Sequence, residues 1–174
     1  MIKLNEQSLQ HLLALHYVYP LTFNVYKKLI QSIDFIDNLS TISPTKLANI
    51  LQTSLKKSET ILQNYLKMLQ VDLLSAYEAE SIKTVPYNDK YYPKSLFELV
   101  DPPTVLYAKG DVTLSTKERK IAIVGSRNAT NYSSMALDFI IPPLVEQNFV
   151  IVSGLAKGAD SLAHTSTIHY GGKT

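Results

Sequence analysis

The sequence predicts an α/β protein, in which a small helical domain of the sterile-alpha-motif (SAM-like) kind precedes a partial, extended Rossmann-like domain with a parallel sheet. Two observations predict this class. All six glycines lie from Gly110 onward, so we expect the preceding chain to be built without positive-φ turns or close backbone approach. Apolar residues recur at helical spacing through the first part, whereas two short apolar runs, each ending in a glycine turn, follow residue 119.

Composition excludes several classes of function. The chain has 174 residues, 45% of them hydrophobic and 18% charged, which suits one domain or two small ones with a packed core. It has no cysteine, which excludes disulfides, zinc–thiolate sites and cysteine nucleophiles and fits a reducing compartment. The net charge of +2 does not favour a large polybasic surface. Because no apolar stretch is long enough to span a bilayer, we expect a cytoplasmic protein without a membrane partner.

The helical domain is expected to contain four or five short helices. Thr22 is a candidate N-cap for the second helix, and Ser43-Pro44 is a start signal for the third. A longer amphipathic run is expected to begin at Ser58 or Thr60. The apolar stripes are Leu9, Leu12, Leu13 and Tyr17; Val25, Tyr26, Leu29, Ile30 and Ile33; Leu47, Ile50 and Leu51; and Ile61, Leu62, Tyr65, Leu69 and Leu73.

A helix-hairpin-helix DNA reader is an alternative function for this domain. Such a hairpin binds phosphate through backbone N–H groups and contains glycine, but the corresponding turn, Gln52-Thr53-Ser54, contains none. Lys56, Lys57 and Lys67 could still contact phosphates. The sequence favours a packing or protein-contact module with a solvated lysine face.

We divide the chain into a helical bundle at 1–80, an extended connector at 81–110 and a C-terminally incomplete Rossmann-like domain at 111–174. Short strands are expected near 82–85 and 104–108 in the connector, whose prolines favour extended backbone. Four tyrosines there could stack on bases, but wedging of the connector against the next domain is the favoured interpretation. They are Tyr87, Tyr91, Tyr92 and Tyr107.

The last part of the chain alternates strands and helices. Buried strands are expected at 120–124 and 149–152, with a helix between them and another from about Ala159 to Tyr170. Pro142-Pro143 should kink the first of these helices. Ligands of such sheets bind at the carboxyl ends of the strands, where both glycine turns lie.

The two glycine turns predict an anion-binding site. Gly125 and Gly154 permit tight turns that expose N–H groups near a helix N-terminus. Serines flank both turns, and Arg127 supplies a planar fork suited to phosphate. The candidate DNA-binding residues are Gly125, Ser126, Arg127, Ser153, Gly154, Lys157 and Gly158.

Better-known motifs do not fit. A P-loop would need glycine where Thr167 stands, and Arg127 breaks a dinucleotide-binding pattern. Asp160 and His164 lie four residues apart, but we expect Asp160 to cap or orient the loop and His164 to pack beneath it. No metal motif is present, and no catalytic residue, metal or cofactor is predicted.

Several motifs resemble the DNA processing protein A (DprA/Smf) family. Residues 121–127, followed by Thr130 and Tyr132, resemble its first motif, and 153–160, followed by Ala163-His164, resemble its second. Gly171-Gly172-Lys173-Thr174 is similar to the segment leading into its third strand. The resemblance begins at about Val85 with the family's entry segment, whose matching residues are Tyr92-Pro93, Leu96, Asp101-Pro102-Pro103, Leu106-Tyr107 and Gly110.

The resemblance implies a single-stranded DNA binding recombination mediator. Family members protect incoming DNA during natural transformation, load the RecA recombinase, carry out no chemistry on DNA and form homodimers. It also implies that Asn148 stands where glycine commonly ends a helix, a left-handed position that asparagine tolerates. Ala159 stands where isoleucine is usual. The family continues for further strands and another arginine-containing motif, so we expect dimerisation to be doubtful for this segment.

Two alternative functions stay open. The first is a nucleotide-binding or nucleotide-processing enzyme of the lysine-decarboxylase-like Rossmann group. That enzyme would need a glycine-threonine phosphate motif and a catalytic Glu or Arg further along. The second is a helical interaction module with a ligand-free α/β half.

Overall fold

The computed structural model describes residues 4–174 and divides into two compact units. The first unit ends at Val112, and the second unit comprises Thr113–Thr174. The α/β class with a helical N-terminal portion is confirmed. The segment 81–110 belongs to the first unit, although the sequence suggested a connector entering the second domain.

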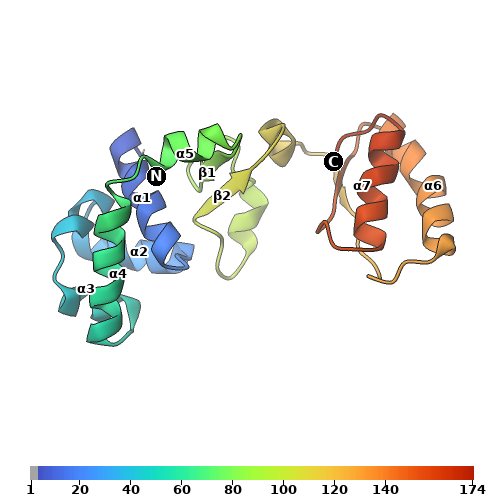
Figure 1. The fold of residues 1–174 in the computed structure, drawn as a ribbon. Coiled ribbons are helices and arrows are strands. Elements are labelled where there is room, and N and C mark those ends of the chain that lie inside the picture. The colour runs from blue at the N-terminus through green and yellow to red at the C-terminus, as the bar shows by residue number, and fades with distance from the viewer. Residues whose placement is uncertain (1–3) are drawn as a thin grey trace. The chain divides into compact units, whose positions relative to one another are not determined.

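Five α-helices dominate the described part of the first unit (Figure 1, blue to green). They are α1 (Glu6–Val18), α2 (Phe23–Ile33), α3 (Pro44–Leu51), α4 (Leu55–Met68) and α5 (Leu73–Ala79). Two of the predicted start signals are confirmed. The Thr22 hydroxyl accepts a hydrogen bond from the Val25 amide at 3.4 Å, and the Ser43 hydroxyl accepts one from the Lys46 amide at 3.3 Å.

The predicted start of the fourth helix was wrong. Ser54 is the N-cap of α4 and accepts a hydrogen bond from the Lys57 amide at 3.3 Å. Ser58 lies inside the helix, fully buried, with its hydroxyl 2.8 Å from the Pro44 carbonyl oxygen and 2.7 Å from that of Leu55. Its hydroxyl therefore joins α4 to α3 instead of starting a helix.

The core of the first unit forms where the helical stripes meet. Leu12, Leu13, Leu29, Leu47 and Tyr65 have no exposed surface. The stripe of α1 is narrower than expected, because 62% of Tyr17 is exposed.

A two-stranded antiparallel sheet packs into the same core. Strand β1 (Lys83–Pro86) pairs with β2 (Val105–Ala108), so that Val85 lies opposite Leu106. The Thr104 hydroxyl donates a hydrogen bond to the Leu21 carbonyl at 3.0 Å, which ties β2 to the helices.

The connector tyrosines pack on the first unit, so the expected wedge against the next domain was wrong. Tyr87 and Tyr92 are buried in the first unit's core. The ring of Tyr87 lies 4.8 Å from that of Phe23 on α2. The ring of Tyr107 lies 5.0 Å from that of Tyr77 on α5.

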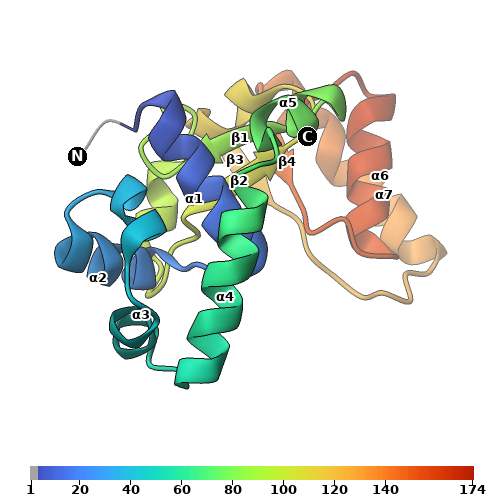
Figure 2. The same ribbon diagram turned by 60° about the vertical axis from the view of Figure 1, so that its left-hand side comes forward.

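The second unit contains a parallel strand pair and two helices. Strand β3 (Lys120–Ala122) pairs with β4 (Val150–Val152), and the Ile151 amide donates to the Lys173 carbonyl at 2.9 Å on the other side of β4. Helices α6 (Asn131–Glu146) and α7 (Ala159–His169) lie side by side in both views (Figures 1 and 2).

The predicted burial of the strands holds only in part. Ile151 is buried with Leu137, Ile141 and Ala163. In contrast, 36% of Ile121 and 44% of Val152 are exposed. Helix α6 continues through Pro142 and Pro143 to its end, and the kink there stays a prediction. Over residues 4–174, no helix is long and apolar enough to cross a membrane.

Candidate functional site

Two loops follow the parallel strands at the carboxyl edge of the sheet. The first loop (123–130) joins β3 to α6, and the second loop (153–158) joins β4 to α7. Since the strands are parallel and paired in register, both loops leave the sheet at the same edge. The seven predicted site residues all lie in these loops.

The glycines allow the two loops to touch. A Cβ on Gly125 would lie 2.6 Å from the Ala159 Cβ. Gly158 has a φ of +88°, and a Cβ there would overlap the Ser126 carbonyl oxygen and lie 2.6 Å from the Arg127 carbonyl oxygen. These contacts require glycine for close backbone approach, whether or not a ligand binds.

The first loop presents free donors. Within the described residues, the backbone N–H groups of Gly125, Ser126 and Arg127 donate no hydrogen bond. The Ser126 carbonyl accepts a hydrogen bond from the Ala159 amide at 3.0 Å, and its hydroxyl accepts one from the Asn128 amide at 3.1 Å. Three consecutive N–H groups without a partner, in residues that are exposed, are therefore available to an anion.

Two cations lie on the loops. Arg127 and Lys157 are exposed, and neither side chain makes a hydrogen bond or ion pair within residues 4–174. Lys157 directly precedes Gly158, whose backbone touches that of Arg127. The structure thus brings the Arg127 and Lys157 segments together.

The second loop is closed by its own carboxylate. Asp160 is only 7% exposed, and its Oδ2 accepts hydrogen bonds from the Gly154 amide at 3.1 Å and the Ala156 amide at 3.5 Å. The prediction that Asp160 orients the loop is confirmed. The expectation that the Gly154 N–H is exposed for a ligand was wrong, because Asp160 supplies the anion at this turn.

The Ser153 hydroxyl and the His164 ring also have internal partners. The Ser153 hydroxyl donates to the Ile123 carbonyl at 2.6 Å. His164 Nδ1 lies 2.6 Å from the Thr174 hydroxyl, which donates to the Ile151 carbonyl at 2.8 Å. Ser153, Asp160 and His164 therefore bind other groups and do not form a nucleophile–base–acid chain. Within residues 4–174, no cluster of three His, Asp or Glu side chains could hold a metal ion.

Sequence reasoning missed two apolar groups at this edge. Val124 and Leu155 are 78% and 74% exposed, and Leu155 has a left-handed φ of +54°. Left-handed backbone is rare for leucine. The local signal was weak, since Val124 ends an apolar run that predicts a buried strand and Leu155 follows directly after the second glycine turn.

The lysines of the alternative hairpin site lie elsewhere. Lys56, Lys57 and Lys67 are exposed on α4 in the first unit. Gln52 takes the left-handed conformation at the end of α3, with φ +51°. The turn therefore closes without glycine.

The fold and the loops define a class: an α/β protein with a helical N-terminal unit and paired strand-end loops that carry free N–H groups and cations. A family model described as DNA recombination-mediator protein A matches residues 83–174. This match covers more than half of the chain, and the chain belongs to that family.

Similar curated proteins are named DNA processing protein DprA or protein Smf. The chain is 44% identical over 112 residues to DNA processing protein DprA of Bacillus subtilis, covering 64% of this chain and 37% of that protein. It is 43% identical over 86 residues to DprA of Streptococcus pneumoniae, covering 49% of this chain and 30% of that protein. It is 30% identical over 151 residues to protein Smf of Synechocystis, covering 85% of this chain and 38% of that protein.

A solved structure is also similar. The X-ray structure of DprA from Streptococcus pneumoniae has a TM-score of 0.50 and 26% identity, covering 86% of this chain and 54% of that one. The chain spans less than two fifths of the length of these curated relatives and about half of the solved chain.

Proposed function

We propose that this protein is a single-stranded DNA binding recombination mediator that protects incoming DNA and loads RecA during natural transformation. The observation that carries the proposal is the run of three free N–H groups at Gly125, Ser126 and Arg127. Backbone donors bind phosphate oxygens without reading base sequence, which is what a mediator acting on any strand requires.

Arg127 and Lys157 are the proposed phosphate contacts of the loops. The guanidinium can bind a phosphate in bidentate fashion or stack on a base, and the ammonium acts as a point charge. Gly158 and Gly125 keep the loops close enough for one strand to contact both. Ser153 and Gly154 shape the second loop and are not proposed as direct donors, because their hydroxyl and N–H are already bonded.

The proposed partners are single-stranded DNA, RecA recombinase and a second copy of the full-length protein. We propose that the protein is cytoplasmic and that the loops hold DNA without catalysing a reaction on it. The family membership supports these partners, and light scattering of a full-length form, with and without purified RecA, tests them.

Fluorescence anisotropy with a labelled dT oligomer tests the DNA proposal. Arg127→Ala and Lys157→Ala should each weaken binding about tenfold, the loss of one charge-assisted hydrogen bond of roughly 1.5 kcal/mol. Each change should also reduce the salt slope by about 0.7 on a log–log plot. Lys56→Ala and Lys57→Ala on α4 are the matched controls and should change little.

Equal binding after the loop substitutions would overturn the proposal. Loss of binding only in the α4 variants would move the site to the first unit. Release of a base from a nucleoside monophosphate would instead support the nucleotide-processing alternative.

A further inference from the structure

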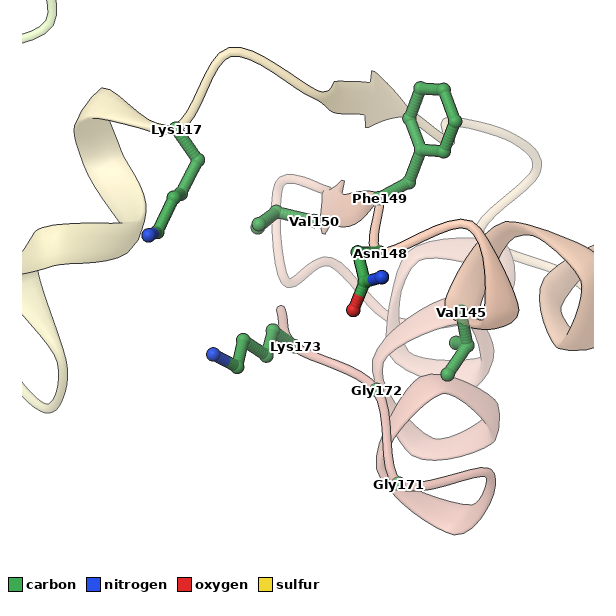
Figure 3. A pocket seen from close by; sticks show the side chains of 8 residues that line it. All are labelled: Lys117, Val145, Asn148, Phe149, Val150, Gly171, Gly172 and Lys173. Carbon is green, nitrogen blue, oxygen red and sulfur yellow. The ribbon is translucent and has the colours of Figure 1, made fainter.

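A second cationic site lies at the opposite edge of the β3–β4 sheet. A pocket of about 230 Å³ opens there, where β3 and β4 begin. Lys117, Asn148, Gly172 and Lys173 are among the residues that line it (Figure 3). None of these residues belongs to the first or second loop.

The two lysines have no counter-charge. Figure 3 shows the side chains of Lys117 and Lys173 extending toward the same open space. Within residues 4–174, neither ammonium makes a hydrogen bond or ion pair, and no Asp or Glu lines the pocket. Two like charges beside one pocket disfavour each other, so an anion between them would be stabilised.

Two neighbouring cations, unlike Lys117 and Lys173, donate hydrogen bonds within the chain. The Arg119 guanidinium donates to the Gln147 carbonyl at 3.1 Å, and the Lys120 ammonium donates to the Ser115 carbonyl at 2.7 Å. Both of these cations are thus bound to backbone carbonyl groups. Lys117 and Lys173 are therefore the cations at this edge that are left available to a ligand.

The backbone around the pocket is fixed by packing. A Cβ on Gly172 would overlap the Val145 side chain and lie 2.9 Å from the Thr167 side chain, so only glycine fits between α6 and α7. Lys173 forms a parallel bridge with Val150, which places the lysine at the start of β4. Asn148 is held at φ +58°, where its side chain lies beside Lys173 (Figure 3).

We propose that this amino-edge pocket binds a phosphate group between Lys117 and Lys173. Two ammonium groups suit the tetrahedral oxygens of a phosphate. The site is separate from the carboxyl-edge loops, so a phosphate can occupy it whether or not those loops bind DNA. The phosphate can belong to a nucleic-acid backbone or to a free phosphate-bearing molecule.

NMR titration of the ¹⁵N-labelled chain tests the proposal, with inorganic phosphate in one arm and a dT oligomer without terminal phosphates in the other. The amide signals of Asn148, Gly172 and Lys173 should shift in at least one arm. Lys117→Gln and Lys173→Gln should each weaken that response about fivefold, as expected for one partly exposed charge contact. Lys56→Gln is the control and should leave it unchanged.

The outcomes show which molecule carries the phosphate and whether it binds at this pocket. A response to the oligomer assigns a nucleic-acid backbone, and a response to phosphate alone assigns a free phosphate group. No response of these amides in either arm, or an equal response in both lysine variants, overturns the proposal. Signals from Gly125, Ser126 and Arg127 report on the proposed DNA loops independently in the same spectra.

Discussion

The two units differ in how completely they bury their apolar residues. Twenty buried apolar residues form one cluster in the first unit, whereas the corresponding cluster in the second unit has four. Both units expose some large apolar side chains, but in the smaller second unit they lie on its strands, loops and helices alike. Those of the second unit are Ile121, Val124, Tyr132, Met135, Phe139, Ile140, Val152, Leu155, Ile168 and Tyr170. The first unit thus has a large packed core, whereas the second unit has a small core and many exposed side chains.

Charge follows the same division. Residues 1–112 carry eleven Lys or Arg and eleven Asp or Glu, so they are neutral overall. Residues 113–174 carry six Lys or Arg against four Asp or Glu, which accounts for the whole net charge of +2. The net positive charge therefore belongs to the unit with the smaller core, which is where the phosphate sites are proposed.

The largest effect is expected in the core of the first unit. Leu13→Ala should lower the free energy of unfolding by about 2–5 kcal/mol, because Leu13 is fully buried and leaves a cavity. Leu99→Ala, at a residue 52% exposed in the same unit, is the control and should change it by less than about 0.5 kcal/mol. Urea unfolding measures both, and similar losses would show that the first unit lacks the packed core described.

A somewhat smaller loss of stability is expected when a glycine that the second unit needs for a positive φ or a close contact is replaced. Gly158→Ala should destabilise it by about 2–4 kcal/mol, because positive φ is strained and the new Cβ overlaps the first loop. Gly171→Ala has a comparable φ of +72° but open space around it, so only the strain of roughly 1 kcal/mol should remain. Thermal unfolding distinguishes the two, and equal losses would argue against loop contact.

A smaller loss of stability is expected when the bonds that close the second loop are removed. Asp160→Ala should cost about 1–3 kcal/mol, because it removes the acceptor for the Gly154 and Ala156 amides. Asp160→Asn should recover part of this loss, since its carbonyl oxygen can still accept. Amide hydrogen exchange at Gly154 and Ala156 measures closure directly, and unchanged exchange in the alanine variant would contradict it.

The smallest effect concerns pH and the first unit. Burial lowers the pKa of His16 below its ordinary value of 6.5, so folding favours the neutral ring. The stability it contributes is present above pH 6.5 and is lost as pH falls toward the folded-state pKa. His16→Gln should therefore reduce the fall in melting temperature between about pH 7.5 and about pH 5.5. An identical fall in both proteins would show that His16 has no such role.

Local signals predicted much of the fold, and long-range contacts explain the errors. Thr22 and Ser43 were identified as caps because a cap depends on residues only three positions away. Ser58 was wrongly predicted to start a helix because its hydroxyl bonds to α3. Tyr87 and Tyr92 were wrongly predicted to contact the next domain because their burial depends on α2 and β2. The left-handed backbone of Asn148, with φ +58°, agrees with what the family resemblance implied, since glycine is common at this position in the family.

The sequence predicted which loops form the candidate site, but it did not predict the hydrogen bonds within them. The glycines that follow the two predicted strands identified both loops. The loops were expected to lie together because parallel strands bring their carboxyl ends to one edge of the sheet. The bond from the Gly154 N–H to Asp160 was not foreseen, since it depends on how the loop folds back onto α7. Within residues 4–174 the N–H groups of Leu155, Lys157 and Gly158 also donate no hydrogen bond, so donors available to a ligand lie in both loops.

The most direct test of the central claim is an NMR titration of the chain with a dT oligomer of about 12 nucleotides. We predict that the amide signals of Gly125, Ser126, Arg127 and Lys157 shift with DNA concentration, while those of Lys56 and Lys57 in the first unit do not. Shifts confined to the first unit, or no shift at Gly125, Ser126 and Arg127 under conditions where the oligomer binds, would contradict the account.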